Sequence, residues 1–323
     1  MRRVLPAVVA AALLVFGIVA EAHAQAFPSK TITLIVPFPP GGSTDTVARI
    51  MAEKMQPILG QPVIIENVGG AGGTTAVGRV ARAAPDGYTI DIGQWDTHVG
   101  SIIYKLNHDP ATDFTPIGLI SINPQLLIGK KTLPADDLKG LVAWMKANPG
   151  KALYVNQNAA ARVSGILLEK ATDTKVQFVP YRGAGPAMTD LLAGQVDLLM
   201  VQAAVALPQI QAGTVKAVPN LSPKRSPAIP DIATSDENGV SGLHMSGWFG
   251  FFGPKGMAAD VIAKLNGAMV QALADPATKA RFVQLGLDVA SREQQTPEGL
   301  AAYHKAEIDK WWPIIKAAGI TPD

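Results

Sequence analysis

Cysteine is absent from this 323-residue sequence, and neither sign of charge predominates. Without cysteine the chain has no disulfide, no thiolate metal ligand, no cysteine nucleophile and no lipid-modified N-terminal cysteine. Lysine and arginine total 28 against 26 aspartate and glutamate, which leaves a net charge of +2. Nucleic-acid-binding proteins normally carry a basic excess on one face, so we expect no nucleic-acid partner.

Long apolar runs are also scarce. Beyond residue 24 no stretch of 18 uninterrupted apolar residues occurs, so we expect the mature protein to be soluble. The composition, 48% hydrophobic and 17% charged, is typical of a packed globular protein. Glycine and proline are abundant, 31 and 25, without a collagen-like period, and therefore serve turns and loops.

The N-terminus has the features of an export signal. Arg2 and Arg3 precede an apolar run over residues 5–20, and small residues flank a cleavage point at Ala22-His23-Ala24. This order predicts a secretory signal peptide over residues 1–24. The alternative, a membrane anchor, needs about 20 apolar residues, more than this run supplies. We therefore expect a periplasmic protein, a compartment where disulfides are permitted but not required.

One unit recurs four times: a short apolar strand, a loop of small residues and a helix. In the first, a strand over residues 31–36 precedes the loop 37–42 and a helix from Ser43 or Thr44 to about Leu59. The other units begin with strands at 63–66, 152–155 and 176–179, and further strands are predicted at 88–92, 196–201 and 248–252. The alternation predicts an α/β fold with largely parallel sheets.

The units form two groups, which predicts two domains. We assign residues 25–122 to domain 1, 123–247 to domain 2, and 248–323 to a return segment and C-terminal helices that complete domain 1. Two crossings between the domains make a hinge. Ligands of such sheets bind outside the carboxyl ends of the strands, where helix N-termini attract anions and glycine lets the backbone approach. The sequence therefore predicts an anion-binding cleft between the two domains.

Motifs for other chemistry are missing. Thr75 stands where the third glycine of a dinucleotide-binding G-x-G-x-x-G would be, and no phosphate-binding P-loop motif occurs. No serine lies in a G-x-S-x-G, and the histidines after residue 24 show no metal-ligand spacing. We expect a binding protein with no catalytic residue, no metal and no cofactor.

Three long stretches, 35–55 (IVPFPPGGSTDTVARIMAEKM), 66–90 (ENVGGAGGTTAVGRVARAAPDGYTI) and 179–199 (VPYRGAGPAMTDLLAGQVDLL), resemble the substrate-binding proteins of tripartite tricarboxylate transporters, the Bug family. The resemblance covers essentially the whole mature chain. It implies a two-domain periplasmic-binding-protein-like fold that closes as a monomer on a small organic carboxylate, a di- or tricarboxylate or an aromatic one. The ligand would then pass to the membrane permease of the transporter.

The resemblance also implies a site. The two glycine-rich loops of domain 1, residues 38–45 and 69–74, hold a carboxylate, and residues 156–164 and 180–186 of domain 2 face the rest of the ligand. The sequence departs from the family at 156–164 (NQNAAARVS) and at Val201, where relatives often carry aspartate. The candidate ligand-binding residues are Phe38, Pro40, Gly41, Gly42, Ser43, Thr44, Asp45, Gly70, Ala71, Gly72, Gly73, Thr74, Asp96, Thr97, Asn156, Arg162, Ser164, Tyr181 and Gln202.

Several of these residues have two interpretations. Ser43, Thr44 and Asp45 either hold the ligand or cap the helix that they begin. Arg162 either pairs with a second carboxylate far from the glycine loops or is an exposed surface residue. Gly72 is expected to lie against the ligand, so that Gly72→Val would block binding and leave the fold intact.

Two other functions fit the same residues. One is a sensor or co-receptor that presents a carboxylate to a signalling protein in the membrane instead of a permease. The other is a carboxylate-processing enzyme with a site that no motif reveals.

Overall fold

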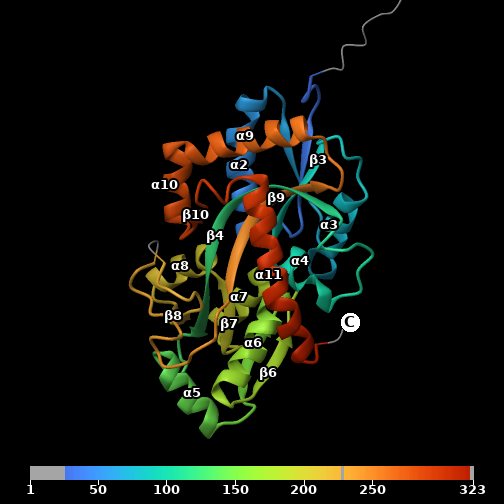
Figure 1. The fold of residues 1–323 in the computed structure, drawn as a ribbon. Coiled ribbons are helices and arrows are strands. Elements are labelled where there is room, and N and C mark those ends of the chain that lie inside the picture. The colour runs from blue at the N-terminus through green and yellow to red at the C-terminus, as the bar shows by residue number, and fades with distance from the viewer. Residues whose placement is uncertain (1–25, 227–228, 321–323) are drawn as a thin grey trace, which may run out of the picture.

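The computed structural model describes residues 26–226 and 229–320, so the expected signal peptide lies outside the described residues. Figure 1 shows two lobes, one above the other, joined by long strands. Within the described part of the chain, no helix is both long and apolar enough to cross a membrane.

The first lobe is built on three parallel strands. Strand β1 (Ile32–Val36) pairs with β2 (Val63–Asn67) on one side and β3 (Thr89–Gln94) on the other. Apolar residues spaced by four, such as Val47, Met51 and Met55, bury one face of the helix after β1. The helices and turns of this lobe are α2 (Ser43–Leu59), η1 (Ala71–Gly73), α3 (Thr74–Ala81), α4 (Trp95–His98), η2 (Gly100–Ile103), α9 (Ala259–Ala274) and α10 (Pro276–Gln284).

The second lobe repeats the plan. Strand β5 (Ala152–Asn156) pairs in parallel with β6 (Val176–Pro180) and β7 (Leu198–Gln202), and their carboxyl ends face the first lobe. The remaining elements of this lobe are α5 (Leu138–Ala147), α6 (Ala159–Thr172), α7 (Ala184–Leu192), α8 (Ala203–Gln211) and β8 (Val215–Asn220).

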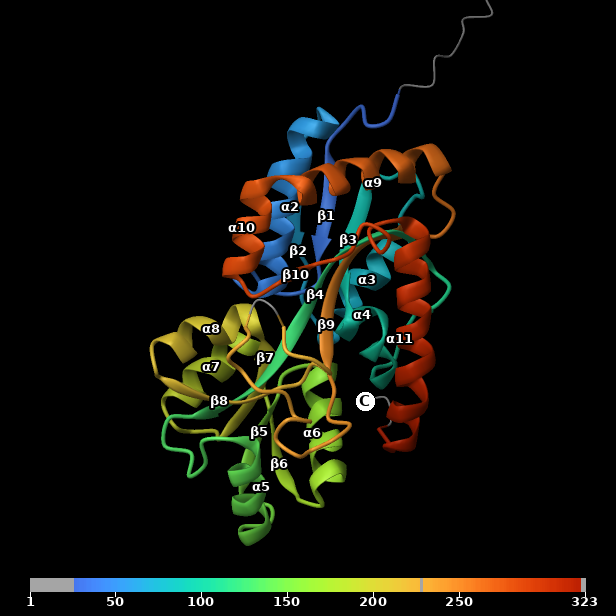
Figure 2. The same cartoon turned by 60° about the vertical axis from the view of Figure 1, so that its left-hand side comes forward.

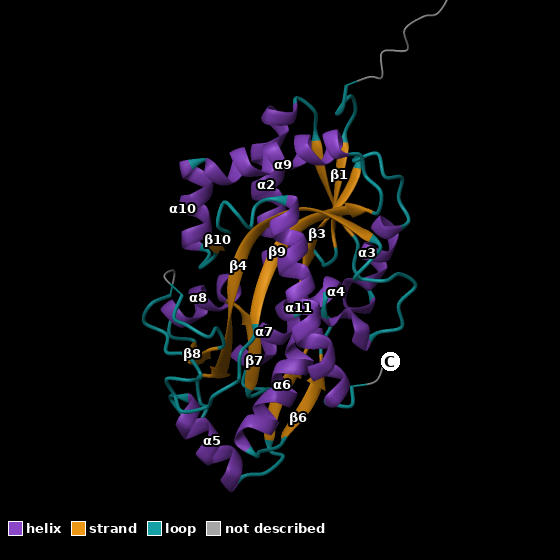
Figure 3. Ribbon diagram, in the orientation of Figure 1, coloured by secondary structure: helices purple, strands orange, loops and turns teal. Residues whose placement is uncertain are grey.

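Two long antiparallel strands belong to both lobes. Strand β4 (Phe114–Lys130) descends from the first lobe to the second, and β9 (Ser246–Pro254) returns beside it, as Figure 2 shows. They complete one sheet with the order β2-β1-β3-β9-β4-β7-β5-β6, in which β8 and the short β10 (Asp288–Val289) also pair with β4. Figure 3 shows helices on both sides of this sheet.

The α/β fold in two lobes confirms the fold class predicted from the sequence. The sheet is mixed and not largely parallel as expected, because β4 and β9 pair antiparallel with their neighbours. Strand β4 was not predicted. Its sequence contains Pro116 and Pro124, which argue against a strand, since proline cannot donate to a sheet ladder. The structure accommodates the first of them beside a register shift between Pro116 and Gly118.

The C-terminal helix α11 (Pro297–Ala317) runs along both lobes (Figure 2). Trp311, which is 2% exposed, packs edge-on against Trp95 of the first lobe with ring centroids 5.2 Å apart. The same apolar cluster contains Tyr154 and Ala160 of the second lobe. The core is therefore continuous across the junction of the lobes.

We predict that Trp311→Ala destabilises the protein by about 3–5 kcal/mol, because it leaves a large cavity at this junction. Urea unfolding followed by circular dichroism measures the loss. The neighbouring Trp312, which is only partly buried, is the matched control, and Trp312→Ala should cost less. Equal costs would show that the junction does not depend on Trp311.

Candidate functional site

Two adjoining cavities lie where the strand ends of the lobes face each other. The first, which we call the glutamine cavity, has a volume of about 460 Å³. It is lined by residues 38–44, Gln94, Asp96, Gln125, Gln157, Asn158, residues 182–186, Met188, Met200, Val201, Gln202, Val205 and Gln209. The second, the glycine-loop cavity, measures about 870 Å³. It is lined by residues 37–39, 69–73, Ile103, Tyr104, residues 156–158, Arg162, Phe178, residues 180–183, Gly319 and Ile320.

Three helices begin at the glutamine cavity without a side-chain cap. The residues at their N-cap positions are Gly42 for α2, Gly183 for α7 and Gln202 for α8, and none caps its helix with a side-chain hydrogen bond. Capping by itself does not mark the cavity, because α9 is also uncapped and begins away from it, whereas α6 is capped by Asn158, which lines both cavities. The N–H groups of the uncapped first turns, with the helix dipoles, favour an anion in this cavity.

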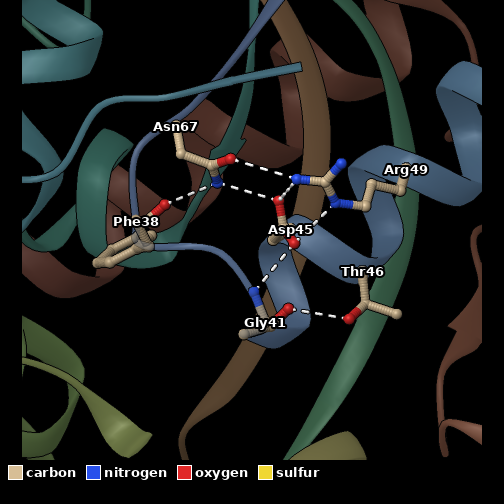
Figure 4. Close-up of polar contacts among 7 residues, drawn as sticks. Phe38, Gly41, Asp45, Thr46, Arg49 and Asn67 are labelled. Atoms are coloured by element: carbon tan, nitrogen blue, oxygen red, sulfur yellow. Dashed lines mark hydrogen bonds and ion pairs between the residues drawn. The ribbon is translucent and has the colours of Figure 1, made fainter. Parts of the chain in front are cut away.

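Asp45 stabilises the first glycine loop through hydrogen bonds and lines neither cavity (Figure 4). Its carboxylate accepts hydrogen bonds from Gly41 N at 3.0 Å, from Asn67 Nδ2 at 3.0 Å and from Arg49 Nε and Nη2 at 2.9 Å each. Burial raises the pKa of Asp45, but the hydrogen bonds outweigh it and the pKa lies below its usual value. Asp45 therefore fixes the loop and does not face the ligand space.

The remaining predicted residues of this loop line the glutamine cavity: Phe38, Pro40, Gly41, Gly42, Ser43 and Thr44. Phe38 also borders the glycine-loop cavity. Thr44 Oγ1 donates to Gln94 Oε1 at 3.2 Å, which ties the start of α2 to the end of β3. Because no side chain caps α2, Ser43 and Thr44 do not have the capping role that was the alternative interpretation.

The second glycine loop lines the glycine-loop cavity with Gly70, Ala71, Gly72 and Gly73. All four have positive φ, from 44° to 122°, a conformation that favours glycine. Thr74 lines neither cavity, and its hydroxyl donates to Ala71 O at 2.8 Å. The two loops thus contribute to different cavities and share only the neighbourhood of Phe38 and Pro39.

Asp96, which is 4% exposed, lines the glutamine cavity from the first lobe. Its carboxylate accepts a hydrogen bond from Ala160 N, in the first turn of α6 in the second lobe, at 2.8 Å. Burial raises the pKa of Asp96 to about 6. The next residue, Thr97, is fully buried, and its hydroxyl lies 3.0 Å from His98 Nδ1. Neither Thr97 nor His98 lines either cavity.

In the second lobe, Asn156, Arg162 and Tyr181 line the glycine-loop cavity, and Gln202 lines the glutamine cavity. Ser164 lines neither, because it is buried against Tyr154 Oη at 2.8 Å. The guanidinium carbon of Arg162 lies 4.1 Å from the centre of the Phe178 ring. Arg162 is therefore not an isolated surface residue. It also shares a cavity with the second glycine loop.

The candidate residues drawn from the sequence omitted much of the glutamine cavity. Gln94, Gln125, Met188, Met200, Val205 and Gln209 were missed. Gln157, Asn158 and Arg182 fell within the segments expected to face the ligand but were not among the candidate ligand-binding residues. The signal for Gln94 was its position at the carboxyl end of β3. For the others, no motif distinguishes a lining residue from a packed one.

Paired lobes with a cleft at their strand ends define the class of substrate-binding proteins. A family model described as "Tripartite tricarboxylate transporter family receptor" matches residues 47–320, and the chain belongs to this family. Protein BugT of Bordetella pertussis is 32% identical over 308 residues, 94% of each chain.

Solved structures agree with this assignment. MatC of Rhodopseudomonas palustris with bound malate is 37% identical, with a TM-score of 0.84 over 90% of this chain and 100% of that one. A second R. palustris protein, with adipate, is 29% identical, with a TM-score of 0.86 over 92% and 100%. The expected resemblance to the Bug family is confirmed.

The structure changes the expected effect of Gly72→Val. A Cβ at Gly72, where φ is 62°, would lie 2.5 Å from the Tyr104 ring, so valine collides with the protein before it meets a ligand. We predict a loss of stability of about 2–4 kcal/mol from the strained backbone and the overpacking. Thermal unfolding measures it.

Gly185→Val is the matched substitution that tests whether the glutamine cavity holds the ligand. Gly185 lines the glutamine cavity, has no strained φ, and has open space where a Cβ would project. We predict unchanged stability and at least tenfold weaker carboxylate binding, a penalty of about 1.4 kcal/mol or more. Undiminished affinity in a folded Gly185→Val protein would remove the glutamine cavity from the ligand site.

Proposed function

We propose that this protein captures a small organic carboxylate in the periplasm and delivers it to the membrane permease of a tripartite tricarboxylate transporter. The observation that carries the proposal is the meeting of three uncapped helix N-termini, those of α2, α7 and α8, in one cavity. These first turns come from both lobes, so an anion there is held from two sides. The relatives with malate and adipate support a carboxylate as that anion.

Two arginines add positive charge to the cleft. Arg182 borders both cavities and Arg162 borders the glycine-loop cavity. The ion pairs found among the described residues do not include either guanidinium. An arginine without a carboxylate partner in a cleft favours an anionic ligand, since its fork geometry matches a carboxylate.

The proposal also covers the export signal, the domain arrangement and the oligomeric state of the receptor. Residues 1–24 direct export and are removed, and residues 123–247 form the second domain between the two parts of the first. The carboxyl ends of β1 and β3 and of β5, β6 and β7 then face each other across the ligand. The receptor acts as a monomer and changes no covalent bond of its ligand.

A thermal-shift screen over di-, tri- and aromatic carboxylates tests this function. A carboxylate present at 100 times its Kd should add about 2.7 kcal/mol to the free energy of unfolding. Calorimetry on each hit then gives the affinity, and mass spectrometry of the recovered ligand shows whether it is unchanged. The proposal fails if no carboxylate stabilises the protein or if the ligand is recovered chemically altered.

We predict that Arg162→Ala weakens a dicarboxylate by about 1.5–3 kcal/mol, the strength of a hydrogen bond to a charged group. A monocarboxylate of equal length should lose little, because its single anionic group is held by the helix N-termini. Arg162→Lys retains the charge without the fork and serves as the control. Equal losses for both ligands in calorimetry would limit Arg162 to packing on Phe178.

A further inference from the structure

An acidic side chain stands in a cavity otherwise suited to anions. Asp96 is the acidic residue among the described residues that line the glutamine cavity. One of its oxygens, Oδ1, is 2.8 Å from Ala160 N, whereas Oδ2 has a long contact of 3.4 Å with Asn158 Nδ2. None of the ion pairs among the described residues involves Asp96, so Oδ2 retains acceptor capacity.

Glutamine oxygens add to this acceptor capacity. Gln157 lines both cavities, and its Nε2 donates to Met200 O at 2.7 Å. This bond fixes the amide orientation and leaves Oε1 as an acceptor, which is buried without a hydrogen-bond partner among the described residues. Gln202 Oε1, at the end of β7, is likewise buried and unpartnered.

We propose that Asp96 and Gln157 make the glutamine cavity selective for carboxylates that also carry a hydrogen-bond donor, either a hydroxyl or an ammonium group. This inference rests on the proposed carboxylate-binding function. The helix N-termini supply donors to the anionic group of the ligand. Asp96 and Gln157 supply acceptors, which only a donor on the ligand satisfies. A ligand whose only polar groups are carboxylates would place its oxygens against those of Asp96 and Gln157. The two acceptors would then have no hydrogen-bond donor.

Helix capping is the competing role for Asp96. The first turn of α6 already has a cap from its own chain, because Asn158 Oδ1 accepts from Ala161 N at 2.9 Å. Asp96 adds a bond to Ala160 N from the other lobe. If this bond were its whole role, Asp96→Asn would lower stability and weaken all ligands equally. A selective role instead changes the ratio of affinities between matched ligands.

Calorimetry at pH 8 on two matched series tests the proposal. Succinate, malate and aspartate differ only by hydrogen, hydroxyl or ammonium at one carbon, and glutarate, 2-hydroxyglutarate and glutamate repeat the comparison one carbon longer. Because burial raises the pKa of Asp96 to about 6, its carboxyl group is ionised at pH 8. In the unaltered protein, the hydroxyl or ammonium member of at least one series should bind about tenfold or more tightly than its parent diacid.

Asp96→Asn and Gln157→Leu should each reduce this ratio to about threefold or less, because the hydroxyl or ammonium ligand loses an acceptor and the parent diacid no longer faces an unpaired one. A ratio that falls more for the ammonium ligand than for the hydroxyl ligand in Asp96→Asn identifies the ammonium as the donor. The matched control is Asp91→Asn, since Asp91 is fully buried in β3 and lines neither cavity, and it should keep the ratio. Melting curves of each variant show that it is folded.

Parent diacids that bind as tightly as their substituted partners overturn the inference and leave the proposed function standing. A ratio that survives both Asp96→Asn and Gln157→Leu also overturns it. If no acid of either series or of the wider carboxylate screen binds at all, the proposed function itself fails, and this inference fails with it.

Discussion

The paired strands β4 and β9 determine how the two lobes meet. Their ladder extends from Phe114↔Pro254 to Pro124↔Ser246, and β4 continues into the second lobe to pair with β7 and β8. Because β1–β3 and β5–β7 flank this ladder from opposite ends, their carboxyl ends point toward one another. The uncapped helix N-termini therefore share one space, which neither lobe could enclose by itself.

Contacts across the junction limit how the lobes can move. Asp96 of the first lobe is bonded to Ala160 of the second, and the apolar cluster around Trp95 and Trp311 includes residues of both. A wide opening at β4 and β9 would expose that cluster and break the Asp96 bond. Motion that keeps α4 and α11 packed on α6, a rotation about this contact, costs less free energy.

The sequence allowed the strand–loop–helix units to be predicted because their signals are local. Residues 31–59 alternate from apolar strand to glycine loop to a helix with Val47, Met51 and Met55 on one face, and the structure has the same elements there. Strand β4 was not predicted, because its prolines are tolerated through a local register shift and pairing with a strand more than a hundred residues away. The direction in which a side chain points could not be predicted from the sequence either. Thr74 turns back onto its own loop, which no spacing indicates.

The same limit explains why the glutamines were overlooked although the glycine loops were recognised. A glycine loop is defined by the backbone conformation that it permits, and this is encoded in consecutive residues. The glutamines gather from β3, β4, β7 and α8 and from the segment after β5, and only the sheet order places them together. A neutral amide neither repels an anion nor neutralises it, so the charge of the cavity is set by helix N-termini, Arg182 and Asp96. Specificity then depends on which amide atoms of the glutamines remain unpaired. Because Gln157 Nε2 donates to Met200 O, the unpaired atom of Gln157 is Oε1, an acceptor.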